Sequence, residues 1–173
     1  MKLNDTIVAE SSPSGKGATS VIRLSGLNSI NIVDKIFPSK DLNKVKSHTL
    51  HYGNIIYNNE IIDEVVIGIF KEPKSYTKEN IVEISCHGSE IIVKKIILIS
   101  IDLGARVAER GEFTFRSFIN GNLDLSQAEA VSELISGKSN NAHRIAINHL
   151  KGVFSDKIKK LRSELINLSS LLE

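Results

Sequence analysis

The sequence predicts an α+β fold, in which a mixed sheet with packed helices forms an N-terminal domain and the start of an α-helical domain follows. Three observations lead to this prediction. Segments with strand patterns fill the first half of the chain, a strongly apolar helix follows them, and only helical spacing remains from Ser126 onward. We place the two domains at residues 1–118 and 119–173.

The strand patterns come in short alternating segments bounded by turn residues. The predicted strands are Thr6–Ala9, Thr19–Leu24, Leu50–Tyr57, Ile61–Phe70 and Ile81–Ser85. Residues 11–17 form a turn between the first two strands. Asn58-Asn59 joins the third and fourth strands into a hairpin, because Asn accepts the left-handed backbone conformation of tight turns.

Two helices are predicted among these strands. Residues 28–37 have helical apolar spacing, and Pro38 ends that helix. Residues 88–103 carry too many apolar side chains for a surface helix, and Gly104 supplies a C-terminal stop. We therefore expect this second helix to be buried against the sheet.

The segment 111–131 predicts a helix, a turn and a second helix. Glu112–Ile119 is amphipathic with Arg116 on its outer side, and the run 120–122 breaks it because Asn and Gly tolerate positive φ. Ser126 and Glu129 have capping-box spacing. Asp124 and Glu112 suit a helix cap and an acidic first turn, respectively.

The remainder is helical, with expected interruptions at Gly137 and Gly152. Its apolar residues step by three and four along a seam that predicts a partner helix: Leu150, Phe154, Ile158, Leu161, Leu165, Leu168 and Leu172. The chain then stops without a cap or a breaker, so we expect it to be a fragment of a longer protein.

Composition excludes several classes of protein. The apolar fraction of 41% and the charged fraction of 24% are typical of soluble globular proteins. A net charge of +2 leaves no overall electrostatic footprint for nucleic acid. The single cysteine, Cys86, excludes an intramolecular disulfide, and no targeting segment or membrane span is visible, so we expect a cytoplasmic protein.

Three short motifs suggest chemistry that their spacing does not support. Gly15-Lys16-Gly17 lacks the flanking Gly and Ser/Thr of a phosphate-binding loop. His48 and His51 resemble half of a metal site, but no thiol or acidic cluster lies near them, so no metal site is predicted.

The third motif is the adjacent pair Cys86 and His87. On a strand the two side chains point to opposite faces, and no supporting carboxylate is evident in the sequence, so a cysteine nucleophile is disfavoured. For His87, pocket lining and structural hydrogen bonding remain equally open.

Arg23 and Glu83 are the strongest candidate site residues. Each lies inside a predicted strand between apolar neighbours, where a charge requires a partner. The pattern alone leaves two explanations open: a structural salt bridge between the two residues, or a pair that faces a ligand.

A family resemblance favours the ligand. Residues 111–131 resemble the GEFSERAF and LDLAQAEA motifs of the tRNA-modifying GTPase family MnmE, also called TrmE. Residues 5–9, 21–26 and 79–88 resemble further stretches of this family at the expected places. The resemblance extends over essentially the whole chain, but no GTPase domain is present.

The resemblance implies a folate-binding domain similar to that of the glycine-cleavage T-protein, which binds 5-formyl-tetrahydrofolate or a related one-carbon tetrahydrofolate. Arg23 and Glu83 match the family's folate contacts, and Asn122 stands where some members have a lysine. No catalytic residue is implied in this chain. The chain is expected to form a homodimer through its N-terminal domain.

At the level of the whole protein, the resemblance implies an enzyme that binds GTP with magnesium and potassium through its missing domain. With an MnmG-type flavoprotein partner it would serve 5-(carboxymethyl)aminomethyl modification of the tRNA wobble uridine. Two alternatives remain open: a free-standing folate-dependent one-carbon transferase, and a purely structural dimerisation domain.

Overall fold

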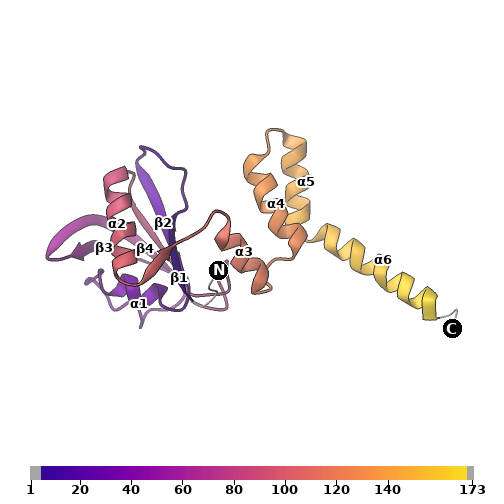
Figure 1. The fold of residues 1–173 in the computed structure, drawn as a ribbon, viewed down its shortest axis with the longest axis horizontal. Helices are drawn as coiled ribbons and strands as arrows, with labels where there is room; N and C mark the ends of the chain where they lie inside the picture. Colours follow the sequence, from indigo (N-terminus) through magenta and orange to yellow (C-terminus); the bar gives the residue numbers. More distant parts are fainter. Residues whose placement is uncertain (1–4, 171–173) are drawn as a thin grey trace. The chain divides into compact units, whose positions relative to one another are not determined.

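The computed structural model describes residues 5–170, apart from the side chains of residues 168 and 170. The chain divides into two compact units, which we call the sheet unit (Met1–Phe113) and the helical unit (Thr114–Glu173). Among the described residues, strands lie only in the sheet unit, and the helical unit consists of helices and the turns between them (Figure 1). The α+β class with a following helical stretch is thereby confirmed, while the domain boundary at residue 118 stays a prediction.

The sheet unit is built on a six-stranded sheet with the order β3-β4-β5-β2-β1-β6. The strands are β1 (Thr6–Glu10), β2 (Thr19–Ser25), β3 (Thr49–Tyr57), β4 (Glu60–Phe70), β5 (Ile81–His87) and β6 (Ala105–Val107). Neighbouring strands are antiparallel except β1 and β6, which run parallel, so the sheet is mixed as predicted. The sequence does not predict β6, because three residues are too few to show an alternating pattern.

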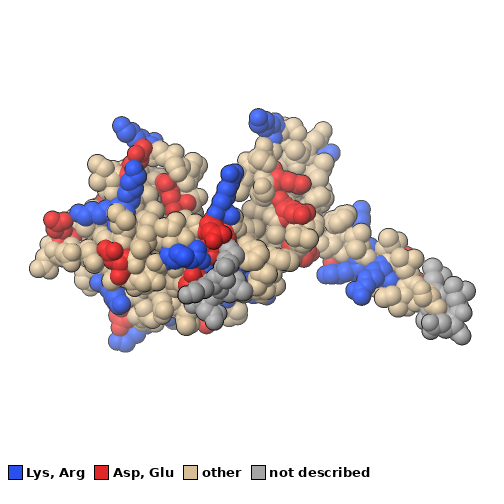
Figure 2. All heavy atoms as spheres, viewed as in Figure 1, with Lys and Arg blue, Asp and Glu red and all other residues tan. Residues whose placement is uncertain are grey.

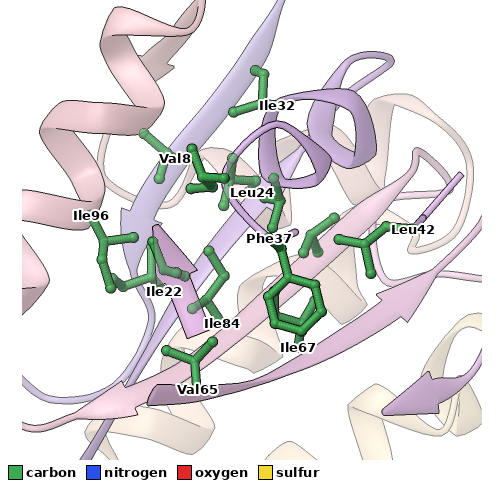
Figure 3. Close-up of a cluster of buried hydrophobic side chains, with 14 of the residues drawn as sticks. Val8, Ile22, Leu24, Ile32, Phe37, Leu42, Val65, Ile67, Ile84 and Ile96 are labelled. Atoms are coloured by element: carbon green, nitrogen blue, oxygen red, sulfur yellow. The ribbon is translucent and has the colours of Figure 1, made fainter. Parts of the chain in front are cut away.

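One face of the sheet carries the hydrophobic core. Figure 3 shows apolar side chains of the strands, among them Ile22 and Ile84, together with Ile96 of α2 (Glu90–Asp102) and with Phe37. Burying such side chains contributes roughly 1.5–3 kcal/mol each relative to leaving them in water. This packing fixes β2 and β5, the two strands that carry the candidate site.

Helix α1 (Ser29–Asp34) is shorter than predicted. Ile36 and Phe37 follow it in a turn, where the Ile36 amide donates to the Val33 carbonyl at 3.1 Å and the Phe37 amide to that of Asp34 at 3.4 Å. Both apolar side chains are fully buried. Their spacing therefore indicated core packing rather than a longer helix.

Helix α2 packs on the sheet through Val93, Ile96 and Ile99. Ile91 and Leu98, on the other side of the helix, are exposed, so the prediction of a buried helix holds for the inner face only. Gly104, with φ of 107°, follows the helix, as predicted from its tolerance of positive φ.

The β3–β4 hairpin is confirmed. Asn58 and Asn59 have φ values of 50° and 63° and connect the two strands, which matches the mirror-image turns favoured in two-residue hairpins. At the far end of β5, Gly88 approaches the glycine turn that precedes β2. The Gly17 amide donates to the Gly88 carbonyl at 3.1 Å, and a Cβ built on Gly88 would lie 2.3 Å from the Gly17 carbonyl oxygen.

The helical unit contains α4 (Leu125–Ser136), α5 (Asn140–Leu150) and α6 (Val153–Ser170), and α3 (Glu112–Ile119) bridges the division between the units. The interruptions fall at Gly137 and Gly152 as predicted. Helices α4 and α5 pack together with Ala130 and Ala146 buried. Of the predicted seam, Leu172 and the side chain of Leu168 lie outside the described residues.

The N-terminal cap of α4 differs in part from the expectation. Asp124 is the cap and forms a capping box with Gln127, which confirms Asp124 as a cap and shows that the predicted box at Ser126 and Glu129 is wrong. The Ser155 hydroxyl also donates to Asp124. Because hydrogen bonds favour the charged carboxylate, this hydroxyl holds the pKa of Asp124 below its usual value.

The prediction that Arg116 lies on the surface is also wrong, because this residue is only 1% exposed. Glu112 is equally buried, and Arg106 donates to it at 2.7 Å and to Asp5 at 2.7 Å. The hydrogen bonds to Glu112 and then to Asp5 raise the pKa of Arg106 above its usual value. Helical periodicity places charged residues on the solvent side of a helix. It does not show when a charged residue is buried beside a partner that is distant in the sequence.

No helix in the part of the chain that the structure describes combines the length and apolarity needed to cross a membrane. Figure 2 shows basic and acidic side chains intermixed over the visible face of the sheet unit. This distribution agrees with the small net charge of the chain.

Candidate functional site

The candidate site lies where β2 and β5 run side by side. Arg23 and Glu83 are directly opposite each other in the antiparallel register, so their side chains emerge on the same face of the sheet. The Arg23 guanidinium donates to one oxygen of Glu83, from Nε at 2.9 Å and from Nη2 at 2.7 Å. The structure thus joins the two residues that the sequence singled out, and the direct contact agrees with the structural salt bridge left open above.

The pair is not sealed inside the protein. The side chains of Arg23 and Glu83 retain 26% and 29% exposure, respectively. Within the described residues, Nη1 of Arg23 and Oε2 of Glu83 have no hydrogen-bond partner. One donor edge and one acceptor oxygen therefore remain available on an ion pair that is already fixed in place.

Two aromatic rings complete the surroundings of Arg23. The guanidinium carbon lies 5.7 Å from the ring centroid of Tyr76 and 5.6 Å from that of Phe113. These distances fall within the range of cation–π attraction. Neither ring could be predicted from the sequence, since no spacing rule connects Tyr76 or Phe113 to Arg23.

Asn122, the third predicted contact, belongs to the helical unit. Its amide Nδ2 donates to the Ser117 hydroxyl at 3.2 Å, and its backbone amide donates to the Ser117 carbonyl at 2.8 Å. Asn122 therefore sits in the ordered turn that follows α3. Its participation in ligand binding stays a prediction.

Cys86 and His87 lie at the end of β5 and point to different surroundings. The buried thiol of Cys86 donates to the Ser20 carbonyl at 3.5 Å, and burial raises its pKa to about 11. A thiol with this pKa stays protonated at neutral pH and is a poor nucleophile. The expectation that no cysteine nucleophile operates here is consistent with this environment.

His87 has a supporting carboxylate that the sequence did not reveal. Asp63 on β4 contacts His87 twice at 2.8 Å, at the backbone amide and at ring Nδ1. His87 also lines a hollow of about 260 Å³ together with Tyr52 and Ser85. Both roles left open for His87, pocket lining and hydrogen bonding, are thus present.

The two remaining motifs lie apart from the ion pair. The turn at 15–17 connects β1 and β2, and Gly15 borders a hollow of about 350 Å³ lined also by Glu90 and Lys94 of α2. His51 contacts Thr49 at 2.8 Å, and burial lowers its pKa. Among the described residues, no group of three or more His, Cys, Asp or Glu side chains is arranged to hold a metal ion.

Comparison with known proteins agrees with the motifs. Residues 6–122 match the family described as "GTP-binding protein TrmE N-terminus", and residues 125–173 match that described as "MnmE helical domain". Similar proteins named "tRNA modification GTPase MnmE" include those of Cytophaga hutchinsonii, Flavobacterium psychrophilum and Enterococcus faecalis, which are 53%, 52% and 46% identical to this chain.

These alignments cover 98% or more of this chain, but only 37% or 38% of the relatives' own length. Both family matches and all three relatives correspond to the same protein family, and together the two matches include both units of the fold. The chain therefore belongs to the MnmE (TrmE) family, of which it represents the N-terminal part.

Proposed function

We propose that this chain binds a one-carbon tetrahydrofolate, 5-formyl-tetrahydrofolate or a close relative, through Arg23, Glu83 and Asn122. The observation that carries the proposal is the Arg23–Glu83 pair, whose partial exposure and unused polar atoms suit a planar polar ligand. A structural ion pair alone requires neither feature.

Each residue has a distinct chemical part in this proposal. The free carboxylate oxygen of Glu83 accepts hydrogen bonds from the aminopyrimidine edge of a pterin, and the free guanidinium edge of Arg23 donates to a carbonyl or carboxylate. The Asn122 amide adds a neutral hydrogen bond where a lysine would add a charge. The bound folate would supply a one-carbon unit, and this chain alone would hold it without turnover.

We further propose that two copies associate through the sheet unit into a homodimer. Leu50, Tyr52 and Ile61 of the β3–β4 hairpin are large apolar side chains exposed to solvent, as an interface requires. Sedimentation equilibrium of the purified chain tests this association, and a monomer at micromolar concentration would contradict it.

In the whole protein, the module would serve 5-(carboxymethyl)aminomethyl modification of the tRNA wobble uridine, with an MnmG-type flavoprotein and with GTP, magnesium and potassium bound by other parts. The names of the relatives, tRNA modification GTPases, support this role. Because the chain spans only 37% of the length of such a relative, we treat it as one module of the tRNA-modifying protein.

Calorimetric titration with 5-formyl-tetrahydrofolate tests the binding proposal. We expect saturable binding to the wild type and a loss of at least about tenfold in affinity for Arg23→Ala and for Glu83→Ala, since each substitution removes a charge-assisted hydrogen bond worth roughly 1.5–3 kcal/mol. Lys95→Ala is the matched control, because Lys95 forms an ion pair with Glu60 at 3.0 Å outside the site.

Three results would contradict the proposal. Absence of binding to the wild type would favour a structural dimerisation domain, and turnover of the folate without a partner would favour a one-carbon transferase. If Arg23→Ala and Glu83→Ala unfold, as thermal melts would reveal, while Arg23→Lys and Glu83→Gln fold and bind as the wild type does, the pair is a structural salt bridge.

A further inference from the structure

We propose that Tyr76 and Phe113 are positioning residues that hold the Arg23 guanidinium in place for ligand recognition. Tyr76 comes from the segment between β4 and β5, and Phe113 from the first turn of α3. This inference rests on the proposed folate site and adds to it two aromatic residues and a ligand selectivity.

The geometry places three partners on one guanidinium. Glu83 takes two N–H donors of Arg23, while the rings of Tyr76 and Phe113 lie 5.7 and 5.6 Å from the guanidinium carbon. Arg23 is at the same time about three-quarters buried, with 26% of its side chain exposed. Cation–π attraction strengthens with such partial desolvation.

Holding Arg23 matters because its side chain is long and flexible. A free arginine loses rotamer entropy when a ligand fixes it. The two rings and Glu83 restrict the side chain before a ligand arrives, so less of this entropy is lost on binding. We therefore expect the rings to increase affinity without contacting the ligand themselves.

The fixed guanidinium also determines which ligand edge fits. Arginine N–H bonds lie in the guanidinium plane, so the unused Nη1 edge of Arg23 requires an acceptor and the unused Oε2 of Glu83 requires a donor. A 2-amino-4-oxo pterin offers both, with its 4-oxo acceptor beside ring and amino N–H donors. A 2,4-diamino pteridine instead places an N–H group opposite the N–H groups of Arg23, and two facing donors leave each other without an acceptor, which weakens binding.

The experiment combines calorimetry with two ligands and NMR of the free protein. We expect the wild type to bind 5-formyl-tetrahydrofolate at least about tenfold more tightly than methotrexate, a 2,4-diamino folate analogue. Tyr76→Leu and Phe113→Leu are expected to bind 5-formyl-tetrahydrofolate about threefold to tenfold more weakly than the wild type does. Their preference for 5-formyl-tetrahydrofolate over methotrexate should also be smaller. Tyr76→Phe, which keeps the ring, should bind within about twofold of the wild type.

The matched control is Phe154→Leu, which removes a half-exposed ring from α6 and should leave both affinities unchanged. The NMR measurement needs no ligand: ring currents from Tyr76 and Phe113 should displace the Arg23 Nε–H and Cδ–H signals from those of exposed arginines, and each leucine variant should remove part of the displacement. A salt bridge alone produces no such ring-dependent change.

The outcomes separate this inference from the proposed function. If the wild type binds neither ligand, the folate site itself fails. If the wild type binds 5-formyl-tetrahydrofolate, and the folded leucine variants have the same affinity for it and the same preference for it over methotrexate, the positioning role is overturned and the folate site stands. If a leucine variant does not fold, undisplaced Arg23 signals in the free wild type would overturn the positioning role.

Discussion

The sheet unit and the helical unit are stabilised in different ways. In the sheet unit, apolar side chains of the strands, α1 and α2 form one buried cluster, with Phe37, Ile22 and Ile84 fully covered. In the helical unit, Ala130 and Ala146 are the apolar residues classed as buried among those described, while large side chains of α6 such as Phe154 and Leu161 are about half exposed.

Local hydrogen bonds have the larger part in ordering the helical unit. Asp124 and Ser139 cap α4 and α5, and Gln127 of α4 donates to the last carbonyl of α5, that of Leu150, at 2.9 Å. Such contacts contribute about 1 kcal/mol each, less than the burial of one large apolar side chain. The Arg23–Glu83 pair therefore lies on strands that are covered by a large apolar core, whereas the helices of the second unit depend more on their caps.

A phenylalanine in each unit provides the sharpest test of this contrast. Phe37→Ala should lower the free energy of unfolding by about 3–5 kcal/mol, because it opens a cavity in a closed core, whereas Phe154→Ala, at 47% exposure, should lower it by less than about 1 kcal/mol. Urea unfolding followed by far-UV circular dichroism measures both. Equal losses in the free energy of unfolding would show that the Phe154 side chain is buried in solution, and the two units would then not differ in the way described.

The backbone contact between Gly88 and Gly17 tests the rigidity of the sheet unit. Gly88→Ala should destabilise the protein by about 1–3 kcal/mol, since the new Cβ would lie 2.3 Å from the Gly17 carbonyl oxygen. Gly17→Ala changes the other side of the same contact, but its Cβ would have 3.8 Å to its nearest atom, so this control should fall within about 0.5 kcal/mol of the wild type. Matching melting temperatures for the two variants would contradict this account.

The Asp124 cap tests the dependence of the helical unit on local hydrogen bonds. Because the folded pKa of Asp124 is lowered, chiefly by the Ser155 hydroxyl, its stabilisation is present above the unfolded pKa and is lost as pH falls through the folded value. Asp124→Ala should lower the stability of the helices by about 1 kcal/mol at neutral pH.

Asp124→Asn is the control for this prediction, because asparagine also caps helices but does not titrate. By circular dichroism of the helices, we expect the asparagine variant to keep most of the helical signal at about pH 7. As the pH falls below the ordinary aspartate pKa of 3.8, its helical signal should fall less steeply than that of the wild type. Identical acid profiles for the wild type and the asparagine variant would exclude a contribution of the charged cap.

Sequence reasoning succeeded where structure follows from local chemistry. The Asn58-Asn59 turn, the stop at Gly104 and the interruption at Gly152 all depend on positive φ values, which few residues adopt. Strand alternation likewise located β2 and β5, and with them Arg23 and Glu83.

It failed where distant residues decide the outcome. Arg116 has a helical position typical of the surface, yet it is buried, and Ile36 and Phe37 have helical spacing but lie in a turn of the core. The Asp63 carboxylate beside His87 comes from another strand, so a search for a neighbour in sequence could not find it.

By itself, the sequence determined most of the elements, their order along the chain and the family, because turn chemistry, hydrophobic periodicity and ordered motifs lie in adjacent residues. Only the tertiary structure decided that Arg23 meets Glu83 across the β2–β5 register and that Tyr76 and Phe113 lie around the guanidinium. The physical reason is that hydrogen bonds and cation–π contacts act over a few ångströms in space, and the folding of the sheet alone brings such distant parts of the chain within that range.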